Sequence, residues 1–150
     1  MVERPARDRT VDVDLVEYVI VVLPDDDAVS RLMPAVAELA RADTIRLLDG
    51  AVVARDERGA THVAELPAST VDGAAPQPTH RGLLSERDLR LTAEGVPVGF
   101  VGVVIVIEDR WAAPLADAAR RAGGQIAGGE RIPPGRLDAI VPVRQHPQRR

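Results

Sequence analysis

The sequence contains no cysteine and very few aromatic side chains, and both absences narrow what the protein can be. Without cysteine the chain can form no disulfide bond, thiolate nucleophile or zinc–thiolate site. Aromatic residues make up 2% of the chain, which has one Trp, one Tyr and one Phe. The hydrophobic core must therefore be built from Val, Leu, Ile and Ala.

Lysine is also absent, because all 19 positively charged residues are arginine, and the formal net charge is -4. A negative net charge argues against a nucleic-acid partner, since basic surfaces are typical of proteins that bind the phosphate backbone. No signal peptide is evident, because the first 14 residues contain no apolar segment. The longest apolar run is about half of the roughly 20 residues that a membrane-spanning helix requires. We therefore expect a cytoplasmic protein without membrane insertion.

Two long apolar stretches, Val16 to Leu23 and Gly99 to Ile107, predict buried strands. Both alternating sets of side chains are apolar in each stretch, which is typical of a strand in the middle of a covered sheet. Each stretch is followed by an acidic turn, a helical pattern with an early proline and a weaker strand. Residues 16–50 and 98–132 therefore form a weak internal repeat.

Two βαβ halves in one chain predict an α+β, ferredoxin-like fold with an antiparallel sheet. In that fold the first strand of each half lies in the centre and the second strand at an edge. Residues 125–132, a short stretch interrupted by glycine, are then expected as an edge strand. A hairpin strand over 60–66 and a short helix over 85–94 form an insertion between the halves. Ser85 and Asp88 predict a capping box at the start of that helix.

The length of 150 residues predicts a single domain, which we place at residues 14–141. It contains a linker over 67–82, rich in Pro, Gly, Ala and Thr and without periodicity. Residues 1–13 and 142–150 are expected to be flexible tails.

Two acidic runs, Asp25 to Asp27 and Glu108 to Asp109, raise the hypothesis of a metal site, because carboxylate oxygens bind magnesium and calcium. In an antiparallel sheet the two runs would lie at opposite ends, and helix capping explains both of them. We therefore expect no metal site.

Nucleophilic catalysis finds little support in the sequence. No His or Cys lies three to five residues from any of the three histidines, so a zinc-binding pattern is absent. No serine lies in a G-x-S-x-G turn. We therefore expect no catalytic residue and no cofactor.

One small-molecule site is conceivable, at the Gly-rich stretch that follows the third helical pattern. Arg120, Arg121 and Arg131 flank it and could hold an anion, although positive charge near a helix C-terminus also has a structural explanation. With Trp111 and Glu130 they form the candidate ligand-binding residues.

The only tryptophan is expected in the core. The spacing of Trp111 and Leu115 predicts that both pack inward while Asp109 caps the helix. Truncating such a core Trp to Ala would cost about 3–5 kcal/mol.

Five segments of the sequence resemble a family of small bacterial proteins of unknown function, of the actinobacterial type. They are VEYVIVVLP, IRLLDGAVVARD, GLLSERDL, EDRWAAPLADAARRAGG and GERIP. The resemblance spans roughly residues 15 to 135 and implies no activity, cofactor or catalytic residue. A more distant similarity is to membrane-associated bacterial proteins with a long Gly-rich apolar insertion between the halves. The linker over 67–82 is short and polar here, which argues against a membrane role.

The second face of the strand over 99–107 needs a cover. Two helices of a ferredoxin-like fold cover one face of its sheet, and the inserted helix over 85–94 is short. Full burial of one Val or Phe side chain contributes about 1.5–3 kcal/mol, so Phe100, Val104 and Val106 should not stay exposed. We expect a second copy to cover this face in a symmetric homodimer.

Two functions remain open at this point. The first is a non-enzymatic, self-associating domain with a stress-related or regulatory role. The alternative is a small-molecule-binding sensor or an enzyme that uses a cleft near Trp111, Glu130 and Arg131 and an unidentified ligand.

Overall fold

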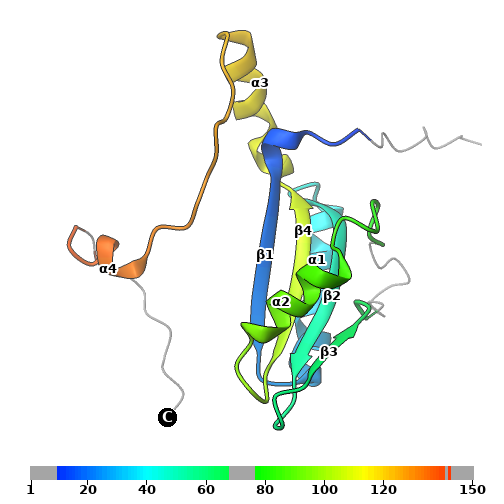
Figure 1. The fold of residues 1–150 in the computed structure, drawn as a ribbon. Coiled ribbons are helices and arrows are strands. Elements are labelled where there is room, and N and C mark those ends of the chain that lie inside the picture. The colour runs from blue at the N-terminus through cyan, green and yellow to red at the C-terminus, as the bar shows by residue number, and fades with distance from the viewer. Residues whose placement is uncertain (1–9, 68–76, 141, 143–150) are drawn as a thin grey trace, which may run out of the picture.

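A computed structural model describes residues 10–67, 77–140 and 142 of the chain. Its four strands form one antiparallel sheet in the order β1-β4-β2-β3 (Figure 1). The protein is therefore an α+β protein, as the sequence predicts. The elements are η1 (Val13–Leu15), β1 (Val16–Leu23), α1 (Asp26–Arg41), β2 (Arg46–Arg55), β3 (Thr61–Ala64), α2 (Glu86–Glu94), β4 (Val101–Glu108), η2 (Arg110–Ala112), α3 (Ala113–Arg121) and α4 (Pro134–Leu137).

The strand order departs from the ferredoxin-like expectation. Strand β4 lies in the centre as predicted, but β1 is an edge strand and β2 takes the second central place. The inserted β3 forms the other edge. Residues 125–132 form no strand, so the element expected beside β1 is missing and β1 stays at the edge.

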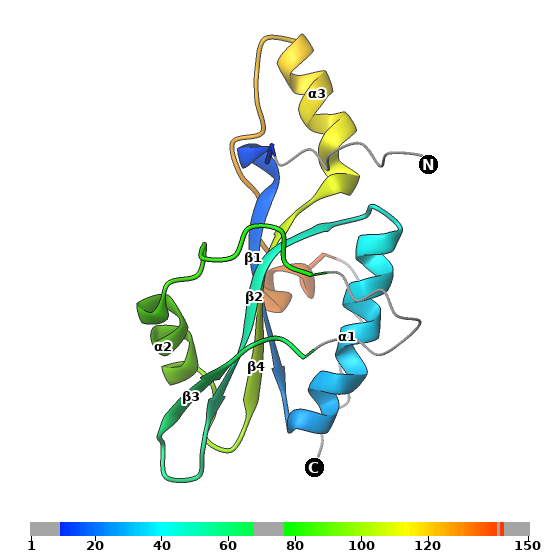
Figure 2. The same cartoon turned by 90° about the vertical axis from the view of Figure 1, so that its right-hand side faces the viewer.

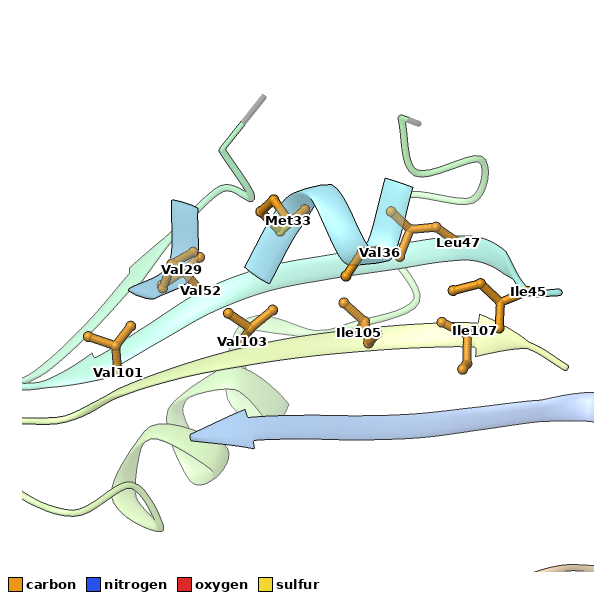
Figure 3. Packing of buried hydrophobic residues seen from close by; sticks show 10 residues of the cluster. All are labelled: Val29, Met33, Val36, Ile45, Leu47, Val52, Val101, Val103, Ile105 and Ile107. Atoms are coloured by element: carbon orange, nitrogen blue, oxygen red, sulfur yellow. The ribbon is translucent and has the colours of Figure 1, made fainter. Parts of the chain in front are cut away.

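Helices cover both faces of the sheet (Figure 2). Helix α1 packs on one face, where Val29, Met33 and Val36 form a cluster with Val103 and Ile105 of β4 (Figure 3). This face supplies most of the apolar core, and its cluster consists of Val, Ile and Leu side chains together with Met33.

Helix α2 covers part of the opposite face. Its Leu89 and Ala93 form a second cluster with Val53 and Val104, and the Val104 side chain is 0% exposed. The prediction that a second copy covers Val104 is therefore wrong. A short helix suffices here because small side chains, such as Ala93, let it approach the sheet closely.

The starts of α1 and α2 follow the predicted caps. The Asp25 carboxylate accepts a hydrogen bond from the Ala28 N–H at 2.8 Å, and α1 begins at the next residue, Asp26. Ser85 and Asp88 form the predicted capping box of α2. The proline in α1 does not delay its start, since the helix runs through Pro34.

Helix α3 does not fold back onto the sheet. It extends beyond the end of the sheet at which β1 begins and β4 ends (Figures 1 and 2). Its buried residue Ala116, together with Ala112 of the preceding η2, packs on Leu15. Trp111 is 65% exposed and Leu115 is 62% exposed, so the prediction that both pack inward is wrong. Only small side chains fit against the short η1 turn.

The described end of the expected linker is attached to β2. The backbone N–H groups of Thr79 and His80 donate to carbonyl oxygens of β2 at 3.2 and 2.7 Å. The buried Asp49 carboxylate accepts hydrogen bonds from the N–H groups of Gly82 and Leu84 at 3.1 and 2.9 Å. These four hydrogen bonds hold residues 79–84 against β2, directly before α2 begins.

The proposed domain limits remain predictions. Residues 1–9, 68–76 and 143–150, which include most of both tails and half of the linker, lie outside the described residues. Of the expected N-terminal tail, Asp12 is held in place, because its N–H donates to Glu108 at 2.6 Å.

Candidate functional site

A polar cluster lies directly after the apolar strand β4, and its centre is Glu108. The Glu108 side chain is 1% exposed and pairs with Arg46 at 2.9 Å and with Arg110 at 3.4 Å. It also accepts the backbone N–H of Asp12. The cluster ties β2, β4 and the N-terminal segment together. The interpretation of Glu108 as a helix cap is therefore wrong, and its role is structural.

The candidate residue Arg120 also connects segments of the fold. Its guanidinium binds the carboxylates of Asp12 and Asp14. The hydrogen bond from Arg120 holds the pKa of Asp12 below its usual range. Arg120 thereby fixes α3 to the segment before β1, while Arg121 is exposed at the end of α3.

The structure brings three of the candidate residues together. Trp111, Glu130 and Arg131 line one hollow of about 900 Å³ between the start of β1 and residues 125–131. Glu17 and Asp109 line the same hollow. Two carboxyl groups that the sequence did not assign to this place therefore lie beside the candidate residues.

The two carboxyl groups interact with each other. Burial is the largest cause, and together with a hydrogen bond to Glu17 and the negative charge of Glu17 it raises the pKa of Asp109 to about 6. A hydrogen bond from the Trp111 side chain lowers the pKa of Asp109 and so offsets part of this rise. Such a pair can take up a proton just below neutral pH. The sequence predicts Asp109 as a helix cap and so gives no sign of this pair, but the Asp109 side chain makes no capping hydrogen bond.

The two acidic runs do not meet. Strands β1 and β4 are antiparallel, with Leu23 opposite Val101 and Val16 opposite Glu108. Within the described part of the chain no three His, Asp or Glu side chains are grouped as metal ligands would be.

Strand β1 has an open edge and an uncovered face. It pairs with β4 and with no other described strand. We call the side chains on its uncovered face the β1 stripe, and each of them is between 41% and 47% exposed. The stripe consists of Val16, Tyr18, Ile20 and Val22.

An apolar groove of about 560 Å³ separates the β1 stripe from α2. Helix α2 packs mainly over β2 and β3 and leaves the β1 stripe exposed. A hydrogen bond of 2.6 Å between the Tyr18 hydroxyl and Thr92 Oγ1 crosses the groove. The other groove walls include Leu83, Leu91 and Val106.

Residues 11–143 match a family of unknown function, DUF6325. The chain belongs to this family. Membership in DUF6325 spans nearly all of the described fold and assigns no activity or site residue. The resemblance to a family of unknown function is confirmed, whereas the bacterial origin and the membrane-associated relatives remain predictions. No curated protein and no solved structure matches the chain.

The helices also bear on the membrane question. Among the residues that the structure describes, no helix is both long enough and apolar enough to cross a bilayer.

Proposed function

We propose that this member of the DUF6325 family is a non-enzymatic domain that associates with a second copy of itself. The observation that supports the proposal is β1, an edge strand with an apolar face left uncovered. Proteins usually protect edge strands with lysine, proline, a bulge or a covering element. Strand β1 has none of the first three, and Glu17 is its one charged residue.

The β1 stripe alone would make a weak dimer. Nearly half of each side chain is still exposed, so covering it contributes about 1 kcal/mol per residue. Loss of translational and rotational freedom costs about 4–15 kcal/mol on association. Backbone hydrogen bonds along the open edge of β1 have to supply part of the difference.

Light scattering on the purified chain tests the proposal. At micromolar concentration we expect about twice the chain mass of 16.1 kDa. Ile20→Arg places a charge on the stripe and should shift the mass towards monomer. Val63→Arg is the matched control, because Val63 is equally exposed (43% against 44%) but lies on β3. A monomer at every concentration would contradict self-association.

One observation favours a second function, a small-molecule sensor or an enzyme. The hollow at Trp111 holds a carboxyl pair, Glu17 and Asp109, together with Glu130 and Arg131. A small-molecule screen read by Trp111 fluorescence tests this alternative. A ligand whose binding is lost in both Glu130→Gln and Arg131→Gln would support it, and the absence of any such ligand would favour the non-enzymatic domain.

The cellular setting remains a prediction from the sequence. We keep the cytoplasm as the expected location, because the chain has no cysteine and so no disulfide bond of the kind common in exported proteins. A stress-related or regulatory role would fit a small self-associating domain.

A further inference from the structure

The internal repeat points to a specific occupant for the open edge of β1. In the first half of the chain, β2 runs parallel to β1 with β4 between them. If the second half followed the same plan, its last segment would run parallel to β4 with β1 between them. That position is the unoccupied edge of β1. We call residues 125–132, which would fill it, the arm.

The chain's own arm cannot reach this position in the required direction. Helix α3 is held pointing away from the sheet, because Ala116 packs on Leu15 and Arg120 binds Asp12 and Asp14. A segment that runs antiparallel to β1 has to start beside Leu23, at the end of β1 that is remote from α3. The 8 residues of β1 span roughly 26 Å at about 3.3 Å per residue.

The connection between α3 and the arm is too short for that distance. Residues 122–124 reach at most about 11 Å when fully extended. The arm instead returns from α3 alongside the start of β1 and runs in the same direction as β1 (Figures 1 and 2). It forms no strand there, and most of its residues are exposed.

A second copy of the chain can supply an arm that runs in the required direction, antiparallel to β1. A two-fold axis perpendicular to the strands at the edge of β1 reverses the partner's arm, which then runs antiparallel to β1 and starts beside Leu23. We propose that each copy completes the other's sheet by pairing its arm with β1. This inference rests on the self-association proposed above and identifies the segment that performs it.

Charge complementarity selects the register. Glu17 is the one charged residue of β1, and Arg131 forms no ion pair within the described residues. In one register Arg131 of the second copy lies opposite Glu17 on the same face of the sheet. Shifting the arm by two residues in either direction would place Arg131 opposite Leu15 or Val19 instead.

The same register also extends the β1 stripe. Opposed residues of antiparallel strands share a face, so Ile126 of the second copy lies opposite Val22 and its Ile132 lies opposite Val16. Ile132 is 54% exposed in the single chain. Within one chain Ile126 packs against the cluster of Leu15, Ala112 and Ala116, so pairing exchanges these contacts for Val22 at one end of the stripe. At the other end it adds the contact of Ile132 with Val16, and it supplies the backbone hydrogen bonds that the stripe alone lacks.

The absence of cysteine allows a clean crosslinking test. In the proposed register Ile20 lies opposite Gly128 of the second copy. Both positions accept a cysteine, since Ile20 is 44% exposed and a Cβ at Gly128 would meet nothing within 4 Å. Tagged Ile20→Cys chains co-expressed with untagged Gly128→Cys chains should form a mixed disulfide after oxidation, at about twice 16.1 kDa in a denaturing gel. Val19→Cys with Gly128→Cys is the control and should not crosslink, because Val19 points to the opposite face.

Two crosslinking results would overturn the arm exchange. The first is a disulfide that forms within one Ile20→Cys/Gly128→Cys chain but not between tagged and untagged chains, which would assign the edge to the chain's own arm. The second is crosslinking of Ile20→Cys to itself, which would show β1 paired with β1. Both results concern the occupant of the edge, whereas light scattering of the unchanged chain decides self-association separately.

A charge swap tests the register. Arg131→Glu should raise the dissociation constant of the dimer roughly fivefold, because it replaces an attraction with a repulsion. Adding Glu17→Arg to the same chain should restore the original value. An unchanged dissociation constant in Arg131→Glu would contradict the pairing of Arg131 with Glu17.

Discussion

Replacing Glu108 by Ala should destabilise the fold strongly, because this carboxylate is the buried centre of several contacts. Its oxygens pair with Arg46 at 2.9 Å and Arg110 at 3.4 Å and accept the Asp12 N–H at 2.6 Å. Removing one partner of a buried ion pair leaves the other charge uncompensated and costs about 3–5 kcal/mol. The Arg46 side chain is 21% exposed, so water can reach it partly and we expect the lower end of that range.

Urea and thermal unfolding followed by far-UV circular dichroism measure this loss. A loss of about 3 kcal/mol lowers the Tm by roughly 10 °C for a chain of this length. Tryptophan fluorescence is unsuitable as a probe, because Trp111 is already 65% exposed in the folded protein. Glu108→Gln keeps the shape and part of the hydrogen bonding, so it should cost less than Glu108→Ala.

The chain offers a matched control in Glu86. It pairs with Arg90 at 3.7 Å on the surface of α2, and its side chain is 82% exposed. Exposed pairs contribute about 0.2–1 kcal/mol, so Glu86→Ala should change the stability little. If Glu108→Ala destabilised the protein no more than Glu86→Ala does, the structural role of the Glu108 cluster would be refuted.

Three further changes have defined outcomes. Trp111→Ala should lower the free energy of unfolding by less than about 1 kcal/mol, because the side chain is mostly exposed. Native fluorescence emission near that of free tryptophan would agree with this exposure, whereas a loss of about 3 kcal/mol would show that the side chain is buried. The pKa of Asp109 is raised to about 6, so the folded protein binds more protons than the unfolded chain between about pH 4 and pH 6 and loses stability as the pH rises through that range. Asp109→Asn should remove this loss in a Tm–pH profile, and an unchanged profile would contradict the raised pKa. Asp49→Ala leaves the N–H groups of Gly82 and Leu84 without their acceptor, so it should lower the free energy of unfolding by about 2 kcal/mol and speed proteolysis near Gly82. Equal proteolysis rates in the variant and the unchanged chain would show that Asp49 does not hold this segment in place.

Local patterns in the sequence predicted most of the elements. The apolar stretches became β1 and β4, and the Asp25 cap and the Ser85 capping box begin α1 and α2. These signals act over a few residues, where composition and backbone geometry determine the outcome.

The position of β1 in the sheet could not be predicted in the same way. A strand apolar on both faces indicates a covered strand, but the covering element can belong to another molecule. The repeat predicted a strand after α3 that corresponds to β2, but residues 125–132 form no strand, and the packing of Ala116 on Leu15 directs α3 away from the sheet. Nothing local to the α3 sequence specifies that direction.

The candidate site shows the same limit. Trp111, Glu130 and Arg131 were predicted to share a cleft, and they line one hollow. Their carboxyl neighbour Glu17 comes from β1, far away in the sequence, so only the fold brings it there. Glu108 was misinterpreted for the same reason, since its partner Arg46 lies on a different strand.

Hydrogen exchange of β1 tests the central claim most directly. In an edge strand the N–H groups of every second residue point away from the sheet, and those of β1 face no described strand. If the arm of a second copy pairs with β1, these amide protons exchange slowly at high protein concentration and quickly after dilution, while the amides of β4 stay protected in both samples. Outward amides of β1 that exchange as fast as exposed amides at every concentration would contradict self-association through this edge.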